Sequence, residues 1–339
     1  MKRKDSFDIA KLILSLMVVM IHVNPVGGGI DSIVFPVVRI AVPLFFMMSS
    51  YFFFGKISNQ NQQYSVNALK KYVFRLSKLY LAWFLVLLPY TLWFRDYFSK
   101  GIMNGLLSLL RGVMLWSTFR ASWYISATII GTVLVYLLSK IASNRIIILM
   151  GGLLYLLCSL LSNYSGISER LPVFVTINKV YPYIWNSFPV SILWIALGKC
   201  FAERQHKPIS MRALILVISL VLLFVENYLG KRFGYIIKDN DCYILLIPTC
   251  IILFDYLLSW DVQINHGKEM RASSTIFYCL HTSMGALIGA SLKRLGITTL
   301  YFPGATVVYI LTIFGCFFFT AVILILERNK KWNWVKIFH

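Results

Sequence analysis

The chain has 339 residues, of which 58% are hydrophobic and only 14% are charged, and its mean hydropathy is +0.73. Soluble domains carry charge on about a quarter of their residues, so this composition excludes an ordinary soluble domain and favours a protein of the lipid bilayer. The formal net charge of +20 is poor evidence for a nucleic-acid partner, because basic residues collect on the cytoplasmic side of membrane proteins.

Apolar stretches long enough to cross about 30 Å of hydrocarbon recur along the whole chain. We therefore predict a single all-α domain over residues 1–339, a polytopic membrane bundle of about ten transmembrane helices. The expected spans are residues 7–25, 33–54, 79–94, 122–141, 145–163, 183–200, 211–229, 243–260, 273–292 and 302–327. The first span lacks a small-residue cleavage site, so we expect it to be retained. Residues 101–117 form an apolar segment that is shorter than these spans, and we expect it to lie in the membrane interface.

The connections between spans differ in charge. Most Lys and Arg residues fall in the connections that would share one side of the bilayer with residues 2–4. The positive-inside rule therefore predicts that both termini are cytoplasmic. No Cys-x-x-Cys or His-x-x-x-His pair occurs, so no metal site is expected.

The first span carries three ionisable residues, Asp8, Lys11 and His22, among apolar ones. Lys11 and His22 are separated by about three helical turns, or about 16 Å, so they project from one helix edge, with Asp8 close to it. Ionisable groups inside a membrane usually face a wet cavity or the bundle interior, which favours a polar path along this edge. Alternatively, His22 reaches interfacial water or a neighbouring helix, and Lys11 snorkels to the inner headgroups.

Two stretches carry a family resemblance. The pattern K11-LILSLMVVMI-H22 resembles the first-helix signature of the membrane acyltransferase-3 family, a basic residue separated from His by ten residues. The stretch "RIAVPLFFMMSSYFFFGK", residues 39–56, is similar to the second helix of that family, although Ser50 stands where the family has Gly. Softer matches are "SWYISA" and "FYCLHTS". The resemblance covers essentially the whole chain and implies a multi-pass protein of a bacterial plasma membrane.

A basic row is expected before the third span. Residues 64–83 have the pattern of an amphipathic helix on the cytoplasmic face, with Lys71, Arg75 and Lys78 on its polar side. Arg75-Leu-Ser-Lys78 resembles the Arg-x-x-Arg of the family, which implies that the row holds the phosphates of acyl-CoA, most often acetyl-CoA. Anionic lipid headgroups are the alternative occupant.

The resemblance implies chemistry at His22. A general base there would remove the proton of an acceptor hydroxyl as it attacks a thioester, and a covalent acyl-imidazole is the alternative. Lys11 and Asp8 complete the expected catalytic set. A second group of expected substrate-site residues comprises Arg39, Ser122, Trp123, Tyr124 and His281. Arg39 is expected to stabilise an oxyanion or, alternatively, to extend its side chain outward to the membrane surface. Trp123, considered by itself, is interpreted as an anchor in the membrane interface.

These features predict an integral membrane O-acyltransferase that moves an acyl group, expected to be acetyl, from cytoplasmic acyl-CoA to a hydroxyl of a glycan or cell-envelope acceptor. The resemblance extends to the membrane halves of serine racemases found with vancomycin resistance. It therefore also implies an alternative in which the chain is an amino-acid (serine) transport module linked to antibiotic resistance. A cytoplasmic domain would then follow residue 339. A membrane anchor or scaffold is a third hypothesis.

Overall fold

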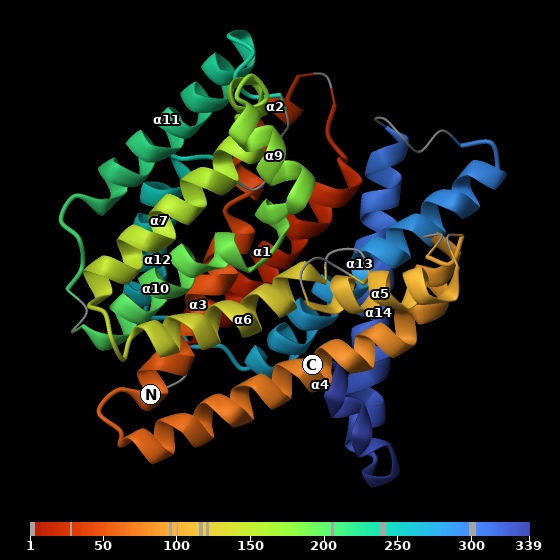
Figure 1. Cartoon of the computed structure of the whole chain (residues 1–339). Coiled ribbons are helices and arrows are strands. Elements are labelled where there is room, and N and C mark those ends of the chain that lie inside the picture. Colours follow the sequence, from red (N-terminus) through yellow and green to blue (C-terminus); the bar gives the residue numbers. More distant parts are fainter. Residues whose placement is uncertain are drawn as a thin grey trace. The chain divides into compact units, whose positions relative to one another are not determined.

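The computed structural model describes residues 4–27, 29–94, 97–99, 101–114, 118–119, 122–204, 207–237, 242–297 and 303–339. Within these residues every regular element is an α-helix or a 3-10 helix (Figure 1), in agreement with the predicted all-α class. The helices form two compact units. Unit 1 comprises Val42–Leu76 and Trp123–Asp261 together with Lys4, and unit 2 comprises Asp5–Ala41, Ser77–Ser122 and Val262–His339.

Unit 2 is built around three long helices that pack along one another, α1 with α13 and α13 with α14. Their apolar residues recur at helical spacing, which gives each helix a face to bury. The bounds in unit 2 are α1 (Asp5–Val23), α2 (Asp31–Val38), the second half of α4 (Gln62–Phe94), α5 (Ile102–Met114), α13 (Gly267–Arg294), α14 (Gly304–Arg328) and the 3-10 helix η2 (Lys330–Phe338).

Unit 1 is organised around α10, which is buried along most of its length and packs against α6 and α7 (Figure 1). Glycines allow this close packing: a Cβ at Gly151 of α7 would lie 2.8 Å from the backbone of Leu193, and one at Gly198 of α10 would overlap Met47 and Ser50 of α3. The bounds in unit 1 are α3 (Ala41–Ile57), the first half of α4, α6 (Trp123–Leu138), α7 (Asn144–Leu161), α8 (Ser165–Ser168), α9 (Pro172–Val180), η1 (Ile184–Asn186), α10 (Phe188–Glu203), α11 (Arg212–Arg232) and α12 (Leu246–Ser259).

Helices occupy all the predicted spans, and a further helix, α5, covers most of the predicted interfacial segment. Seven helical segments in the described part of the chain are long and apolar enough to cross a membrane, whereas α6, α10 and α12 are shorter. Their lengths and compositions support a multi-pass membrane protein. The count of about ten spans and the cytoplasmic placement of both termini stay predictions.

Several predicted boundaries differ from the structure. The second span is two helices, α2 and α3, interrupted at Arg39 and Ile40, because the ring of Pro43 clashes with the carbonyl four residues earlier, that of Arg39. The predicted amphipathic helix over residues 64–83 continues without a break into the third span, and the two form one helix, α4. The sixth span begins at Phe188 instead of residue 183, with Pro189 in the first turn of α10, where proline is favoured.

Candidate functional site

The best-defined pair of candidate catalytic side chains is His22 of α1 and His281 of α13, both in unit 2. Their ring centroids are 5.0 Å apart and the rings are tilted by 41°. His22 is exposed, whereas His281 has an exposed fraction of 0%. Nδ1 of His281 lies 2.7 Å from the carbonyl oxygen of Phe277. Because a carbonyl oxygen only accepts, this nitrogen carries a proton and donates it. The pair therefore joins an accessible imidazole to a buried one of defined orientation.

The chain beyond His22 fixes the end of α1. Asn24 has a φ of 50°, a left-handed conformation that asparagine adopts more readily than most residues. Its backbone N–H donates to the carbonyl of Met20 over 2.9 Å. The following carbonyl, that of Pro25, accepts from the hydroxyl of Thr306 in α14 over 2.5 Å. The last turn of α1, which carries His22, is therefore held from both sides.

The opposite end of α1 is fixed by carboxylates. Asp8 is buried and forms an ion pair with Arg271 of α13, whose side chain is 38% exposed. A carboxylate oxygen of Asp5 accepts the backbone N–H of Ile264 over 2.9 Å. Asp8 is thus already engaged with a guanidinium group. A buried carboxylate requires a nearby cation, but the spacing of residues along α1 does not indicate that Arg271 of α13 is the partner of Asp8.

Lys11 lies between these two contacts. It is half-buried, and its carbonyl accepts from the hydroxyl of Ser274 in α13 over 3.1 Å. Helix α13 therefore supplies a contact to each of Asp8, Lys11 and His22, in the case of Lys11 to its backbone carbonyl. Both α13 and α14 pack along α1 in unit 2, and the catalytic roles of these residues stay predictions.

Arg39 and Ser122 also belong to unit 2. Arg39 is buried at the end of α2, and its guanidinium carbon lies 5.7 Å from the ring centroid of Phe35. Ser122 is buried, and its hydroxyl oxygen accepts the backbone N–H of Thr118 over 3.1 Å and lies 3.5 Å from the hydroxyl of Tyr80. These contacts give Ser122 a structural role in the turn before α6.

Trp123 and Tyr124 begin α6 in unit 1. Their rings pack on Phe46 of α3 with centroid separations of 6.1 Å and 4.6 Å. Trp123 is buried, so the interpretation of this residue as an interfacial anchor is wrong. Contact with the aromatic residues of α3 holds Trp123 in the interior of the unit.

The predicted basic row lies on one helix. Lys71, Arg75 and Lys78 are exposed on α4, four and three residues apart, so helical geometry alone aligns them. No ion pair joins any of the three to a carboxylate in the part of the chain that the structure describes. The guanidinium carbon of Arg75 lies 5.8 Å from the ring centroid of Tyr72. The row therefore presents positive charge that its neighbours leave uncompensated.

Within the described ranges there is no group of three or more His, Cys, Asp or Glu residues that could hold a metal ion. The candidate features that the structure describes are the imidazole pair, the polar edge of α1 and the basic row. Together these features define a helical membrane protein with a candidate acid–base site.

Comparison with known proteins identifies the family. The family model described as an acyltransferase domain, acyltransferase-3, matches residues 4–321, and the chain belongs to this family. An amino-acid racemase of Enterococcus faecalis is 27% identical over an alignment of length 357, which covers 99% of this chain and 48% of that protein. A serine/alanine racemase of Enterococcus gallinarum is 27% identical over 291 residues, 83% of this chain and 40% of that protein. The chain thus spans about half the length of these relatives or less. No solved structure matches it.

Proposed function

We propose that this chain is a membrane O-acyltransferase that moves an acyl group, expected to be acetyl, from cytoplasmic acyl-CoA to a hydroxyl of a glycan or cell-envelope acceptor in a bacterial plasma membrane. The observation that carries the proposal is the pairing of an exposed His22 with a buried His281 in a chain of the acyltransferase-3 family.

His22 acts as the general base in this proposal. Its ring removes the proton of the acceptor hydroxyl while that oxygen attacks the thioester carbonyl carbon. The C–S bond then breaks, and the protonated ring returns the proton to the departing thiolate. His281 touches the ring of His22 and is itself held by the carbonyl of Phe277, so it positions the base.

The other residues of α1 have supporting roles. Asp8 is engaged with Arg271, so we assign it to holding α1 against α13, and Lys11 to the polar path between Asp8 and His22. Arg39 is the proposed cation for the oxyanion of the tetrahedral intermediate, since a buried guanidinium group stabilises developing negative charge.

The donor is proposed to bind at Lys71, Arg75 and Lys78. Coenzyme A carries several phosphate charges, and an exposed basic row with uncompensated charge suits them. Anionic lipid would be attracted by the same charges, so only a binding measurement separates the two.

The names of the relatives favour a second candidate function. Proteins named amino-acid racemase and serine/alanine racemase align with this chain over less than half of their own length. A membrane module attached to such a protein could carry an amino acid, serine first among them, across the bilayer. In that case the polar edge of α1 would line the substrate path.

The first experiment measures transfer or hydrolysis of labelled acetyl from acetyl-CoA by purified protein in lipid nanodiscs. His22→Ala should lower the rate by about 10²–10⁴-fold, the usual contribution of a general base. His266→Ala is the matched control, because His266 is an exposed histidine of the same unit at the start of α13. Equal rates in wild type and His22→Ala would contradict the acyltransferase mechanism, and serine uptake into vesicles without acetyl transfer would support the second function.

The second experiment measures CoA binding to wild type and to a variant with Lys71→Ala, Arg75→Ala and Lys78→Ala. The loss of three charge-assisted contacts should weaken binding by at least about a hundredfold. The control replaces Lys293 and Arg294, exposed cations at the end of α13. Unchanged affinity in the triple variant would rule out the donor site on α4.

A further inference from the structure

The 3-10 helix η2 is a folded part of unit 2 that lies along the end of α14 (Figure 1). It has nine residues, although 3-10 helices longer than three or four residues are uncommon because their hydrogen-bond geometry is poor. At its start the side chain of Asn329 accepts the backbone N–H of Lys331 over 3.0 Å. A 3-10 helix of this length needs contacts with neighbouring helices to hold it.

These contacts lie on one edge of η2. A 3-10 helix has three residues per turn, so Trp332, Val335 and Phe338 share an edge. Val335 is buried. The ring of Phe338 packs on Trp83 of α4 with the ring centroids 5.3 Å apart, and the carbonyl of Phe338 accepts the indole N–H of Trp83 over 3.2 Å. Helix η2 therefore connects the end of α14 to α4.

The basic residues of this region differ in their partners. Glu327 of α14 forms an ion pair with Lys336 of η2 over 3.6 Å. In contrast, Arg328, Lys330 and Lys331 are exposed, and none of them forms an ion pair with a carboxylate among the residues that the structure describes. Three positive charges within four positions of the chain are thus uncompensated.

Two indole rings lie next to these charges in the chain. The side chains of Trp332 and Trp334 are 40% and 58% exposed, and their ring centroids are 6.1 Å apart. Tryptophan collects at the level of lipid headgroups, because its ring is apolar and its N–H is polar. Helix η2 follows α14, which is long and apolar enough to cross a membrane. The two rings are therefore placed where a bilayer surface is expected.

We propose that Arg328, Lys330, Lys331, Trp332 and Trp334, here called the C-terminal basic surface, bind the headgroups of anionic phospholipids. The three cations hold the phosphate groups, and the two indoles lie among the headgroups. Charge complementarity selects an anionic lipid over a zwitterionic one. The exposed indoles beside the end of a candidate span favour a lipid over a soluble anion or an acidic protein segment. Lipid bound there fixes α14, and through η2 also α4, at one membrane surface.

The assignment does not rest on the proposed acyl transfer. The C-terminal basic surface contains neither the histidine pair nor any residue of the basic row on α4. Loss of acetyl transfer in His22→Ala, or loss of CoA binding in the triple variant of α4, leaves lipid binding at η2 unaffected. The two proposals therefore fail separately.

The test uses the full chain in phosphatidylcholine nanodiscs that contain increasing fractions of a photoactivatable phosphatidylglycerol. Cross-links to residues 328–338 are quantified by mass spectrometry of peptides. We expect saturable cross-linking in the wild type. Lys330→Gln should weaken binding about fivefold, and the combination of Arg328→Gln, Lys330→Gln and Lys331→Gln about a hundredfold, because each basic residue near an anionic surface contributes about a factor of five.

The matched control replaces Lys293 and Arg294 by glutamine. These are exposed cations of the same unit, at the end of α13, and the half-saturation at residues 328–338 should not change. A second measurement compares unfolding of the wild type and the triple variant in mixed micelles. We expect equal stability, because the three cations form no ion pair within the described residues, and this result separates loss of lipid binding from loss of the fold.

Three results would overturn the proposal. Equal half-saturation in the wild type and the triple variant would exclude the cations from the site. Equally strong cross-linking by a photoactivatable phosphatidylcholine would show contact with the bilayer without selection of a headgroup. Displacement of phosphatidylglycerol by a soluble polyglutamate peptide or by CoA would make the surface a site for an acidic protein segment or a soluble polyanion.

Discussion

The two units hold their helices together in different ways. In unit 1, glycines bring backbones into direct contact, so that α10 lies against α7 and α3 with no space for another methyl group. In unit 2, polar side chains link the helices: Asp8 to Arg271, Ser274 to the backbone of α1, and Thr306 to the carbonyl of Pro25. Unit 1 also has polar links between helices, such as that of Lys199 in α10 with Asn144 in α7, but direct backbone contact gives it a rigid frame, whereas the unit with the histidine pair depends on contacts that can be broken singly.

The largest effect is expected at Gly198 of unit 1. Its missing side chain is required, because a Cβ would overlap the hydroxyl of Ser50 and the backbone of Met47. Gly198→Ala should cost about 3 kcal/mol of stability, since backbone cannot move aside and overpacking typically costs about 1–3 kcal/mol. The measurement is unfolding in mixed micelles, with Gly152→Ala as control because a Cβ at Gly152 would meet nothing within 4 Å. Equal losses in both variants would refute the close-packed frame.

The next effect concerns the polar links of unit 2. Asp8→Ala leaves the guanidinium of Arg271 without its partner, and removing one member of a buried pair costs about 3–5 kcal/mol. We expect the loss to be about 2 kcal/mol, below that range, because the side chain of Arg271 is 38% exposed and can turn to solvent.

The control for the pair is a double substitution. Asp8→Asn with Arg271→Gln keeps hydrogen bonding without charge, so it should recover part of the stability lost in Asp8→Ala. Asp261→Asn, at an exposed carboxylate of unit 1, should leave stability unchanged. A double variant no more stable than Asp8→Ala would show that the polar link does not hold α1 to α13.

The sequence predicted the positions of the helices because the length of an apolar run is a local property. It did not predict the interruption at Arg39, since the effect of Pro43 depends on whether a single helix would otherwise continue through it. The amphipathic pattern of residues 64–83 predicted a helix that leads into the third span, and the structure has the two as one helix, α4.

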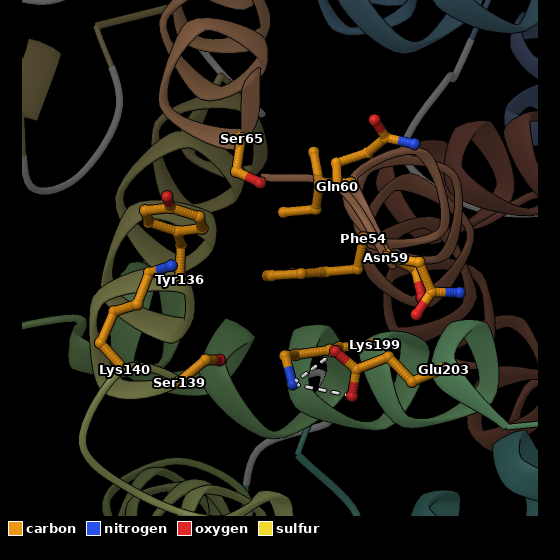
Figure 2. A pocket seen from close by; sticks show the side chains of 11 residues that line it. Phe54, Asn59, Gln60, Ser65, Tyr136, Ser139, Lys140, Lys199 and Glu203 are labelled. Atoms are coloured by element: carbon orange, nitrogen blue, oxygen red, sulfur yellow. Dashed lines mark hydrogen bonds and ion pairs between the residues drawn. The ribbon is translucent and has the colours of Figure 1, made fainter. Parts of the chain in front are cut away.

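The candidate site was predictable in part. Helical spacing placed Asp8 and His22 on one edge, and α13 meets both of these residues. Arg271 and His281 could not be assigned as their partners, because periodicity shows which face of a helix is polar but not which helix lies opposite. Lys140 lines a polar cavity of unit 1 (Figure 2), and no sequence pattern indicates this, since the cavity forms from segments that are distant in the sequence.

A smaller effect is expected at Glu327 of α14, a second buried acid of unit 2. It pairs with Lys268 over 2.8 Å, Lys336 over 3.6 Å and His339 over 3.2 Å. The lysine side chains are 58% and 54% exposed, so they hydrate readily when the acid is removed. Glu327→Gln should therefore cost only about 1 kcal/mol. Faster hydrogen exchange confined to residues 330–338 would reveal this local destabilisation. If Glu327→Gln lost as much stability as Asp8→Ala, the exposure of the partner side chains would not determine the size of the effect.

The smallest effect is expected at Gly285, the counterpart of Gly198 in unit 2. A Cβ there would lie 3.3 Å from the hydroxyl of Thr312 and 3.6 Å from a methyl group of Val23, so a shift of a few tenths of an ångström accommodates it. Alanine also has the better helix propensity, by about 1 kcal/mol, and Gly285→Ala should change the free energy of unfolding by less than about 0.5 kcal/mol. Because Val23 follows His22 directly and Gly285 lies one turn after His281, the acetyl-transfer rate is the more sensitive readout. A severe loss of stability in Gly285→Ala, comparable with that of Gly198→Ala, would mean that both units are packed through backbone contacts and that the polar links of unit 2 are incidental.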